Sequence, residues 1–352
     1  MDTPRHTPEP DDRGPRPDID AIINTTTRYQ PQLSDPLVAP YRHVSSSASN
    51  NQNVRTRFLQ AFNVIYAIDS SQVLAEIGTI IQMFHDSSLL IDDIEDDSVY
   101  RRGKLAAHRQ YGMPLTLNCG NLMYFVALQR AQDQLLQLVK DAGGAGDPQA
   151  LKLRINDIII GEMLNLHRGQ GLDIYWRDNL HQLRQQLPSI DDYLEMVKHK
   201  TGGLFRLSLQ LMALVSSQFN DDLMAIANLL GVIYQIRDDY MNVNSQQYAD
   251  SKGMAGEDLL EGKLSLPILW CLQHADASPV HDILFQYTSA SDRRKHMHLV
   301  GAACDYLASC GAMDFTASLM VEYRDKVLDL LQSYLTVSGS KLESIILALT
   351  QM

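Results

Sequence analysis

The residues best suited to chemistry are acids that gather at the end of an apolar segment. Five of the six residues at 92–97 are Asp or Glu. Asp92 and Asp96 are four positions apart, so on a helix they share one face, where like charges repel each other. Two explanations are open for such a cluster. It is a solvated helix end neutralised by the following Arg101 and Arg102, or it binds a divalent cation through oxygen ligands.

A second acidic pair favours the cation. Asp238 and Asp239 end another apolar segment, and together with Gln235 and Asn242 they occupy one helix face, at positions i, i+3, i+4 and i+7. Two such helices facing each other would place carboxylates on both walls of a cavity. Because Mg²⁺ binds through one or two carboxylates together with waters and substrate phosphates, the pattern predicts a diphosphate held by several magnesium ions. An EF-hand does not fit, because its ligand order is absent at both places.

Basic side chains stand near both acidic clusters and could bind phosphate oxygens. His85 precedes Asp92 by seven residues, which puts it on the same helix face and ~10 Å away at 1.5 Å per residue. A single cation of this kind is more often part of a surface ion pair. The association with two acidic helices is what favours phosphate binding. The other members of this set are Arg101, Arg102, Lys200, Lys252 and Lys263.

Helices must position these groups, because apolar residues recur at helical spacing along most of the chain. The segments with this pattern are 58–66, 77–91, 122–129, 155–166, 192–217, 221–242, 264–273, 295–309, 312–335 and 342–350. No convincing alternating strand is present, and neither an internal repeat nor a shift in composition marks a domain boundary. We therefore predict a disordered Pro-rich tail at 1–18 and one all-α domain at 19–352.

Composition excludes several classes of protein. The 352 residues contain 42 acids and 30 Lys or Arg, a net charge of −12, which argues against binding to a nucleic-acid backbone. No apolar run approaches the roughly 18 residues of a membrane span. The N-terminus lacks the apolar core of a secretory signal, and the four cysteines form no CxxC pair. We expect a cytoplasmic protein with reduced thiols and no transmembrane segment.

Five motifs in a fixed order give the chain a family resemblance. They are DDIED at 92–96, RRG at 101–103, KTGG at 200–203, YQIRDDYMN at 234–242 and EDLLEGK at 257–263. The set resembles the trans-isoprenyl diphosphate synthases, and NLHRGQGLDIYWRD at 165–178 is most similar to fungal, yeast-like geranylgeranyl diphosphate synthases. The resemblance implies a single-domain isoprenoid-synthase helical bundle around a deep central cavity. It also implies a homodimer or higher homo-oligomer.

The same resemblance implies a reaction and a set of site residues. The reaction is the magnesium-dependent condensation of isopentenyl diphosphate with dimethylallyl, geranyl or farnesyl diphosphate to a C20 diphosphate. Asp92 and Asp96 would bind two Mg²⁺ ions and Asp238 a third, supported by Asp93 and Asp239, with Lys200 also in the catalytic set. The allylic diphosphate would contact Arg101, Lys200, Thr201, Gln235, Asn242, Lys252 and Lys263. Isopentenyl diphosphate would contact Arg55, His85 and Arg102.

One residue departs from the family pattern. The family usually has a Lys three positions before the Arg at 55, in a GKxxR pattern, and this chain has Gln52 there. The loss of that cation predicts a weaker isopentenyl site or one that depends on Arg55, His85 and Arg102. It also motivates an alternative, in which the chain is a regulatory subunit of a heteromeric synthase.

Product length depends on how the cavity is closed. Ser87 and Ser88 lie one turn before Asp92, and such small side chains would leave a passage open for the growing prenyl tail. Tyr124, Phe125 and His167 match positions that form the floor in similar yeast enzymes. Without the resemblance, the two aromatic rings would be interpreted as core packing and His167 as a hydrogen-bonded core histidine.

A class I terpene cyclase is the other enzyme considered, because it shares the fold, the metals and the carbocation chemistry. Cyclases usually carry a Ser or Thr and then a Glu after the second pair of acids. The residues that follow Asp238 and Asp239 here are Tyr-Met-Asn-Val-Asn-Ser-Gln, which lack both at the required spacing. The sequence therefore favours the synthase.

Overall fold

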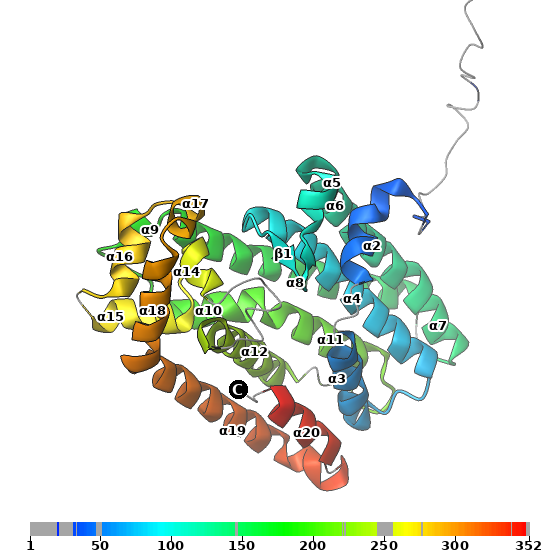
Figure 1. The fold of residues 1–352 in the computed structure, drawn as a ribbon. Helices are drawn as coiled ribbons and strands as arrows, with labels where there is room; N and C mark the ends of the chain where they lie inside the picture. The colour runs from blue at the N-terminus through cyan, green and yellow to red at the C-terminus, as the bar shows by residue number, and fades with distance from the viewer. Residues whose placement is uncertain are drawn as a thin grey trace, which may run out of the picture.

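Helix α12 (Met224–Asn244) runs through the middle of the molecule and packs against helices on several sides (Figure 1). The structure is a computed structural model, and it describes residues 20, 31–32, 34–46, 51–144, 147–219, 221, 223–244, 256–275, 277–338 and 340–349. The described residues are almost entirely helical, which confirms the prediction of an all-α fold. The predicted tail at 1–18 lies outside the described residues.

The elements that precede α12 are η1 (Pro36–Val38), α2 (Ala39–Ser45), α3 (Asn51–Tyr66), α4 (Ser71–Glu95), β1 (Tyr100–Arg101), β2 (Lys104–Leu105), α5 (Ala107–Tyr111), α6 (Met113–Arg130), the π-helical turn η2 (Ala131–Leu135), α7 (Leu136–Asp141), α8 (Pro148–Asp178), α9 (Leu180–Leu183), α10 (Ile190–Lys200) and α11 (Gly202–Val215). Those that follow it are α14 (Glu257–Glu261), α15 (Leu266–His274), α16 (Pro279–Gln286), α17 (Ala290–Arg294), α18 (Met297–Ser309), α19 (Ala312–Ser338) and α20 (Ser340–Leu349).

Helix α4 carries the first acidic cluster and is anchored by its apolar face. Its N-cap Ser70 accepts a hydrogen bond from the Val73 N–H. Ile77, Ile80 and Phe84 are buried where α4 packs against α3, α6 and α11. Because the interior of this 25-residue helix is fixed in the core, its C-terminal end has a defined position, and the acids project from that end.

Two close backbone approaches fix the break between α10 and α11. A Cβ on Gly231 of α12 would lie 2.3 Å from the Gly202 Cα, and a Cβ on Gly169 of α8 would lie 2.3 Å from the Lys200 nitrogen. Only glycine permits contacts this close. Helices α8 and α12 therefore contact the segment 200–202 closely from two sides.

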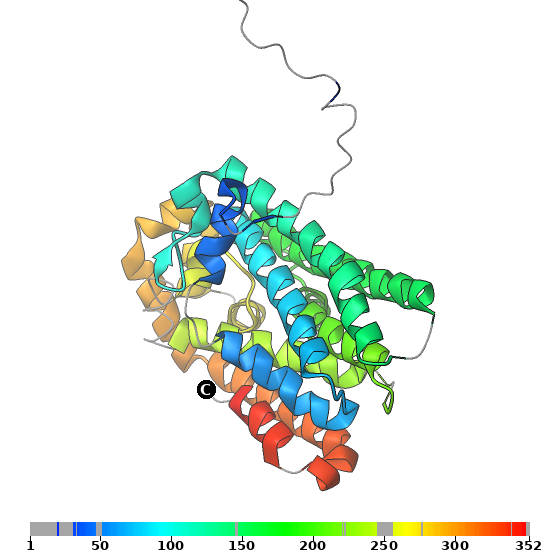
Figure 2. The ribbon, with the colours of Figure 1, turned by 90° about the vertical axis from the view of Figure 1, so that its right-hand side faces the viewer.

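The chain after α12 builds the two ends of the bundle. Helices α14 to α18 cluster at one end, and α19 runs back along α12 and α15 (Figure 1). Helix α20 then packs against α3, so the C-terminal part of the described chain lies beside the N-terminal half (Figure 2). Residues from both halves therefore meet around one core.

One short segment of the described residues forms a pair of strands, which the sequence did not predict. Tyr100 pairs with Leu105 and Arg101 pairs with Lys104 in a two-stranded antiparallel ladder. Arg102 and Gly103 occupy its turn with φ of 54° and 74°, a conformation that a short hairpin favours. The ladder is too short to show an alternating pattern in the sequence. None of the described helices combines the length and the apolar character needed to cross a bilayer.

Candidate active site

A cavity of about 300 Å³ opens between α3, α4, α6, α8, α10, α11 and α12. Its acidic lining gathers where α4 and α12 end, and includes Asp92 and Asp238. Apolar side chains line its deeper part. Ile81 is eleven residues before Asp92 on α4, which corresponds to roughly 16 Å along the helix axis. The cavity is therefore charged at the mouth and apolar in depth.

We call Asp92, Asp93 and Asp96 the first rim, because they stand at the end of α4. Asp92 Oδ2 is 3.0 Å from Arg101 Nη2, and its Oδ1 accepts a hydrogen bond of 3.1 Å from Gln170 Nε2. The same Gln170 amide donates to Glu95 at 2.8 Å. Of the three acids of this rim, Asp92 lines the cavity, whereas Asp93 and Asp96 do not.

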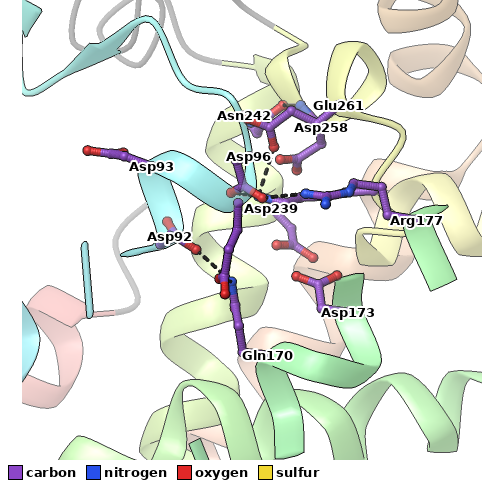
Figure 3. A network of polar contacts seen from close by, with 12 residues as sticks. Asp92, Asp93, Asp96, Gln170, Asp173, Arg177, Asp239, Asn242, Asp258 and Glu261 are labelled. Atoms are coloured by element: carbon purple, nitrogen blue, oxygen red, sulfur yellow. Dashed lines mark hydrogen bonds and ion pairs between the residues drawn. The ribbon is translucent and has the colours of Figure 1, made fainter. Parts of the chain in front are cut away.

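Asp93 is buried and does not line the cavity. Arg101 Nε donates to its Oδ1 at 2.7 Å. Its side chain points away from Asp96, Arg177 and Asp173 (Figure 3). Burial raises the pKa of Asp93, although Arg101 acts in the opposite direction. Asp93 thus holds Arg101 at the mouth, where that guanidinium also contacts Asp92 and lines the cavity.

Asp96 is engaged by two cations from other parts of the chain. Arg177 Nη1 lies 2.7 Å from its Oδ1 (Figure 3). Lys263 Nζ lies 2.6 Å from its Oδ2. Burial raises the pKa of Asp96, and the charge of Lys263 opposes this. A metal ion bound by Asp96 would therefore replace or share these contacts.

We call Asp238 and Asp239 the second rim. Both line the cavity at the end of α12. Asp239 accepts hydrogen bonds from Tyr193 Oη at 2.6 Å, from Gln235 Nε2 at 2.8 Å and from the Leu266 N–H at 2.8 Å. Burial raises the pKa of Asp239 to about 6, and the three hydrogen bonds limit that rise. These neutral hydrogen-bond donors accordingly fix the position of the Asp239 carboxylate.

Two lysines and a threonine complete the mouth. Lys200 Nζ contacts Asp173 Oδ2 at 2.5 Å, and Thr201 Oγ1 donates to Gln235 Oε1 at 2.7 Å. Lys263 Nζ also contacts Glu261 at 2.7 Å. Burial raises the pKa of Asp173, but Lys200 and Lys263 outweigh it and leave the pKa below its usual value. Lys200 and Lys263 thus bring two ion-paired cations to the acidic lining of the cavity.

The structure corrects the expectation for Asn242. We expected this residue to face the allylic diphosphate, but its side chain is 1% exposed and does not line the cavity. Its Oδ1 accepts a hydrogen bond of 3.3 Å from the Asp258 N–H, and its carbonyl accepts one from Gly256. Helix α12 extends beyond the cavity, so Asn242 lies past it and its side chain binds the start of α14.

The predicted isopentenyl site is described only in part. His85 lines the cavity, and Arg102 Nη2 lies 3.3 Å from its Nε2. Arg102 Nη1 also lies 3.7 Å from the buried Asp86. The side chains of Gln52 and Arg55 and all of Lys252 lie outside the described residues, so their assignments remain predictions.

Three residues of the predicted tail-binding part line the cavity. Ser88 lines the passage, and the rings of Tyr124 and His167 meet edge to face with centroids 5.9 Å apart. His167 Nδ1 lies 2.7 Å from the Met163 carbonyl oxygen, a hydrogen bond within the helix. Tyr124 also stacks with Phe84 at 6.1 Å. These rings form a rigid wall between α6 and α8.

Two predictions for the tail-binding part are wrong for this chain. Ser87 is fully buried, donates to the Met83 carbonyl oxygen at 2.6 Å and does not line the cavity. Phe125 is 71% exposed and lies outside the cavity lining. Neighbouring residues on a helix point about 100° apart. Ser87 and Phe125 thus point away from the direction of Ser88 and Tyr124, and neither of them lines the cavity.

The sequence interpretation assigned no role to several residues that shape the site. On α8, Gln170, Asp173 and Arg177 share one face at i, i+3 and i+7 and point at the two rims (Figure 3). The polar stripe at helical spacing was a usable signal. Tyr193 carried no such signal, because a tyrosine in an apolar pattern is usually core. Asp258 of α14 also lines the cavity.

The donor chemistry of the two rims fits magnesium, although the acids are not gathered into a compact cluster. Among the described residues, no three His, Cys, Asp or Glu side chains are arranged to enclose a metal ion by themselves. Magnesium commonly binds to one or two carboxylates and completes its shell with waters and phosphate oxygens. Asp92 and Asp238 line the same cavity, and their carboxylate oxygens fit that mode of binding.

Comparison with known proteins assigns a family. The sequence model of the Polyprenyl synthetase family matches residues 37–301. A geranylgeranyl pyrophosphate synthase of Eremothecium gossypii is 38% identical over 318 residues, which are 89% of this chain and 93% of that protein. Geranylgeranyl pyrophosphate synthase D of Phomopsis amygdali is 37% identical over 85% of this chain and 64% of its own length.

A solved structure is similar in fold. The crystal structure of geranylgeranyl pyrophosphate synthetase from Pyrococcus horikoshii superposes with a TM-score of 0.67 at 21% identity, and 90% of each chain is covered. At this identity the likeness concerns the fold, and it agrees with the helical bundle described above. The family model and the fungal relatives confirm the resemblance found in the motifs. The chain belongs to the polyprenyl synthetase family and is a prenyltransferase.

Proposed function

We propose that the protein is a geranylgeranyl diphosphate synthase. It would condense isopentenyl diphosphate with dimethylallyl, geranyl or farnesyl diphosphate and stop at a C20 diphosphate. The observation that carries the proposal is that Asp92 and Asp238, from helices far apart in sequence, line one cavity that becomes apolar in depth. The printed names of the fungal relatives support the same product.

The residues of the mouth suit the departure of a diphosphate. Arg101, Lys200 and Lys263 place positive charge where negative charge grows on the leaving oxygens. Bound magnesium ions, three by our proposal, would supply further charge neutralisation at the same oxygens. Asp92, Asp96 and Asp238 would hold these ions. The apolar depth excludes water, which would otherwise quench an allylic cation.

His85 and Arg102 would hold isopentenyl diphosphate with its double bond toward the allylic carbon. His85 lines the cavity, and Arg102 lies outside the lining but contacts His85. The allylic carbon–oxygen bond breaks first, the isopentenyl double bond then attacks the allylic cation to form the new carbon–carbon bond, and a proton is lost from the isopentenyl unit to the departed diphosphate. Holding both substrates in register contributes an entropic advantage of up to roughly 7–11 kcal/mol in favourable cases.

Tyr124 and His167 would set the length of the product. Their edge-to-face pair forms a wall of the apolar part, and Ser88 leaves room above it. We expect Tyr124→Ala to give products longer than C20 and Phe125→Ala to leave the length unchanged, because only Tyr124 lines the cavity. Chromatography of the dephosphorylated products measures this. An unchanged C20 product from Tyr124→Ala contradicts the wall assignment.

We further propose a homodimer or higher homo-oligomer. Helices α6 and α8 expose the apolar side chains Met113, Leu117, Phe125, Ile160 and Leu164, and surfaces of this kind mark contacts between proteins. A second copy of the chain would cover them. Light scattering on Phe125→Asp and Leu164→Asp should report a smaller particle, and Val64→Asp on α3 serves as the exposed control. A wild-type monomer contradicts the proposal.

One assay tests the activity itself. The purified chain is incubated with labelled isopentenyl diphosphate and each of the C5, C10 and C15 primers, with and without Mg²⁺, and the product is sized. We expect C20 product only with Mg²⁺. Activity that requires another protein supports the regulatory-subunit alternative, and a hydrocarbon formed from geranylgeranyl diphosphate alone supports a cyclase. A lower KM for isopentenyl diphosphate in Gln52→Lys locates its binding site. The single domain at 19–352 and the cytoplasmic location remain predictions from the sequence.

A further inference from the structure

We propose that Arg293 is a positioning residue for diphosphate binding, which acts by fixing the turn that presents Lys263. Arg293 belongs to α17, far from the motifs in sequence, and the cavity lining does not include it. The proposal rests on the function proposed above for Lys263, the contact with the allylic diphosphate. It adds a residue that holds this lysine in place.

The Arg293 guanidinium binds three backbone carbonyls and is almost fully buried. Its Nε donates to the Leu260 oxygen at 2.7 Å, its Nη2 to the Glu261 oxygen at 2.8 Å and its Nη1 to the Tyr287 oxygen at 2.8 Å. Arg293 is 4% exposed. The carbonyls of Leu260 and Glu261 belong to the last turn of α14 and have no partner within that helix. Arg293 therefore caps the C-terminal end of α14.

Burying a cation costs free energy, so we expect Arg293 to make contacts that the fold requires. Burial lowers the pKa of Arg293 to about 10, and the nearby positive charges of Arg177 and Arg294 act in the same direction. The three hydrogen bonds go to neutral carbonyls, which compensate a buried charge less than a carboxylate does. An apolar side chain would fill the space but would leave the carbonyls of α14 unpaired.

The turn that follows α14 requires this contact. Gly262 has φ of 84°, and a Cβ there would lie 2.6 Å from Arg293 Nη2. The guanidinium thus packs directly on the left-handed turn. At the other end of α14, Gly256 packs equally closely on Cys304 of α18, and Asn242 holds the Asp258 N–H. Both ends of α14 are consequently held from outside.

Lys263 is the residue that this turn places in the site. It follows Gly262 directly, and its Nζ lies 2.6 Å from Asp96 and 2.7 Å from Glu261. Asp258 on the same helix lines the cavity. A small displacement of the last turn of α14 moves Lys263 relative to the first rim, and small errors in the placement of a binding group have large effects on catalysis.

The test uses Arg293→Lys and Arg293→Gln in the full chain, with Arg294→Lys as the matched control. Arg294 is the neighbouring residue, and its Nη1 lies 4.0 Å from the exposed Asp97. A lysine at 293 keeps the charge but cannot reach three carbonyls. We expect KM for farnesyl diphosphate to rise roughly tenfold or more while KM for isopentenyl diphosphate changes less than about twofold. Equal changes in both constants, or none, overturn the proposal.

A double mutant and hydrogen exchange separate the proposal from its premise. In a Lys263→Met background, Arg293→Lys should have no further effect on KM for farnesyl diphosphate, and a full additive effect overturns the proposal. If Lys263→Met alone leaves that KM unchanged, the function proposed for Lys263 is what fails. Hydrogen exchange at the backbone amides of 257–263 then tests whether Arg293 positions this turn. Faster exchange in Arg293→Lys than in Arg294→Lys supports the positioning, and equal exchange overturns it.

Discussion

The two rims hold their carboxylates by different means. In the first rim, Asp92, Asp93 and Asp96 contact arginine or lysine side chains. In the second rim, Asp239 is held by the Tyr193 hydroxyl, the Gln235 amide and a backbone N–H. The first rim is held by charge, and Asp239 of the second rim is held by neutral donors.

The difference follows from the number of acids that each helix end must carry. A helix C-terminus already disfavours negative charge, because its carbonyl dipoles point outward. Three carboxylates at the end of α4 need cations, and Arg101, Arg177 and Lys263 supply them. The second rim has two acids, one of them buried among hydrogen-bond donors. A ligand bound at the first rim would therefore exchange ion pairs, whereas hydrogen bonds already fix Asp239.

The largest effect should come from removing the cavity-lining acid of either rim. We expect Asp92→Asn and Asp238→Asn each to lower kcat by about a thousandfold, because each removes a ligand for charge neutralisation in the transition state. Asp97→Asn is the control, since Asp97 is 63% exposed and contacts Arg109 at the surface. Steady-state kinetics at saturating Mg²⁺ measures kcat. Full activity of either cavity variant would contradict the shared site.

Gly231→Ala should disturb the second rim through the backbone. The added methyl would lie 2.3 Å from the Gly202 Cα, so α12 must move away from α11. We expect the free energy of unfolding to fall by about 3 kcal/mol or more, with a loss of activity. Gly161→Ala on α8 is the control, because open space surrounds that position and alanine favours the helix. Urea denaturation measures the free energy of unfolding of both variants, and equal values would refute the close approach.

Tyr193→Phe tests the neutral donors of the second rim. The change removes the hydroxyl that donates to Asp239 and leaves the ring in place. We expect the free energy of unfolding to fall by about 2 kcal/mol, the range for a hydrogen bond to a charged group. Tyr175→Phe, at an exposed position on α8, should change it by less than about 0.5 kcal/mol. If both variants unfold alike, Tyr193 does not hold Asp239.

The smallest effect concerns the start of α10, the helix that carries Tyr193 and Lys200. Hydrogen bonds from the Ser189 N–H and hydroxyl lower the pKa of Asp192 in this capping box. A lowered pKa in the folded state stabilises the protein above the ordinary pKa near 4, and this contribution disappears as the pH falls through the folded value. Asp192→Asn should therefore lose about 0.5 kcal/mol at pH 7 and nothing at the lowest pH. Thermal unfolding at several pH values measures the difference in stability between the variant and the wild type. A loss of stability that is independent of pH would show that the Asp192 carboxylate is not its source.

The sequence predicted the fold class because helical periodicity is a local pattern. Acids at the end of an apolar helix are also a local pattern, and Asp92 and Asp238 both line the cavity. The two-residue ladder at 100–105 was missed, because so short a pairing leaves no periodic signal.

Local patterns also account for the errors. Asn242 shares the face of Gln235 and Asp238, yet α12 extends past the cavity and the side chain binds α14 instead. Phe125 and Ser87 were predicted at the cavity from family positions, and the helical rotation turns them away from it. A helix face is known from sequence, but where the neighbouring helix ends is not.

The sequence by itself determined which helices carry acids and cations and on which face each lies, since helical geometry requires only the neighbours along the chain. Only the tertiary structure decided which cation meets which acid. Arg177 and Lys263 reach Asp96 across 81 and 167 positions of sequence. Arg293 reaches α14 in the same way, through packing between distant helices. Such contacts depend on crossing angles and close approaches that a one-dimensional pattern does not contain.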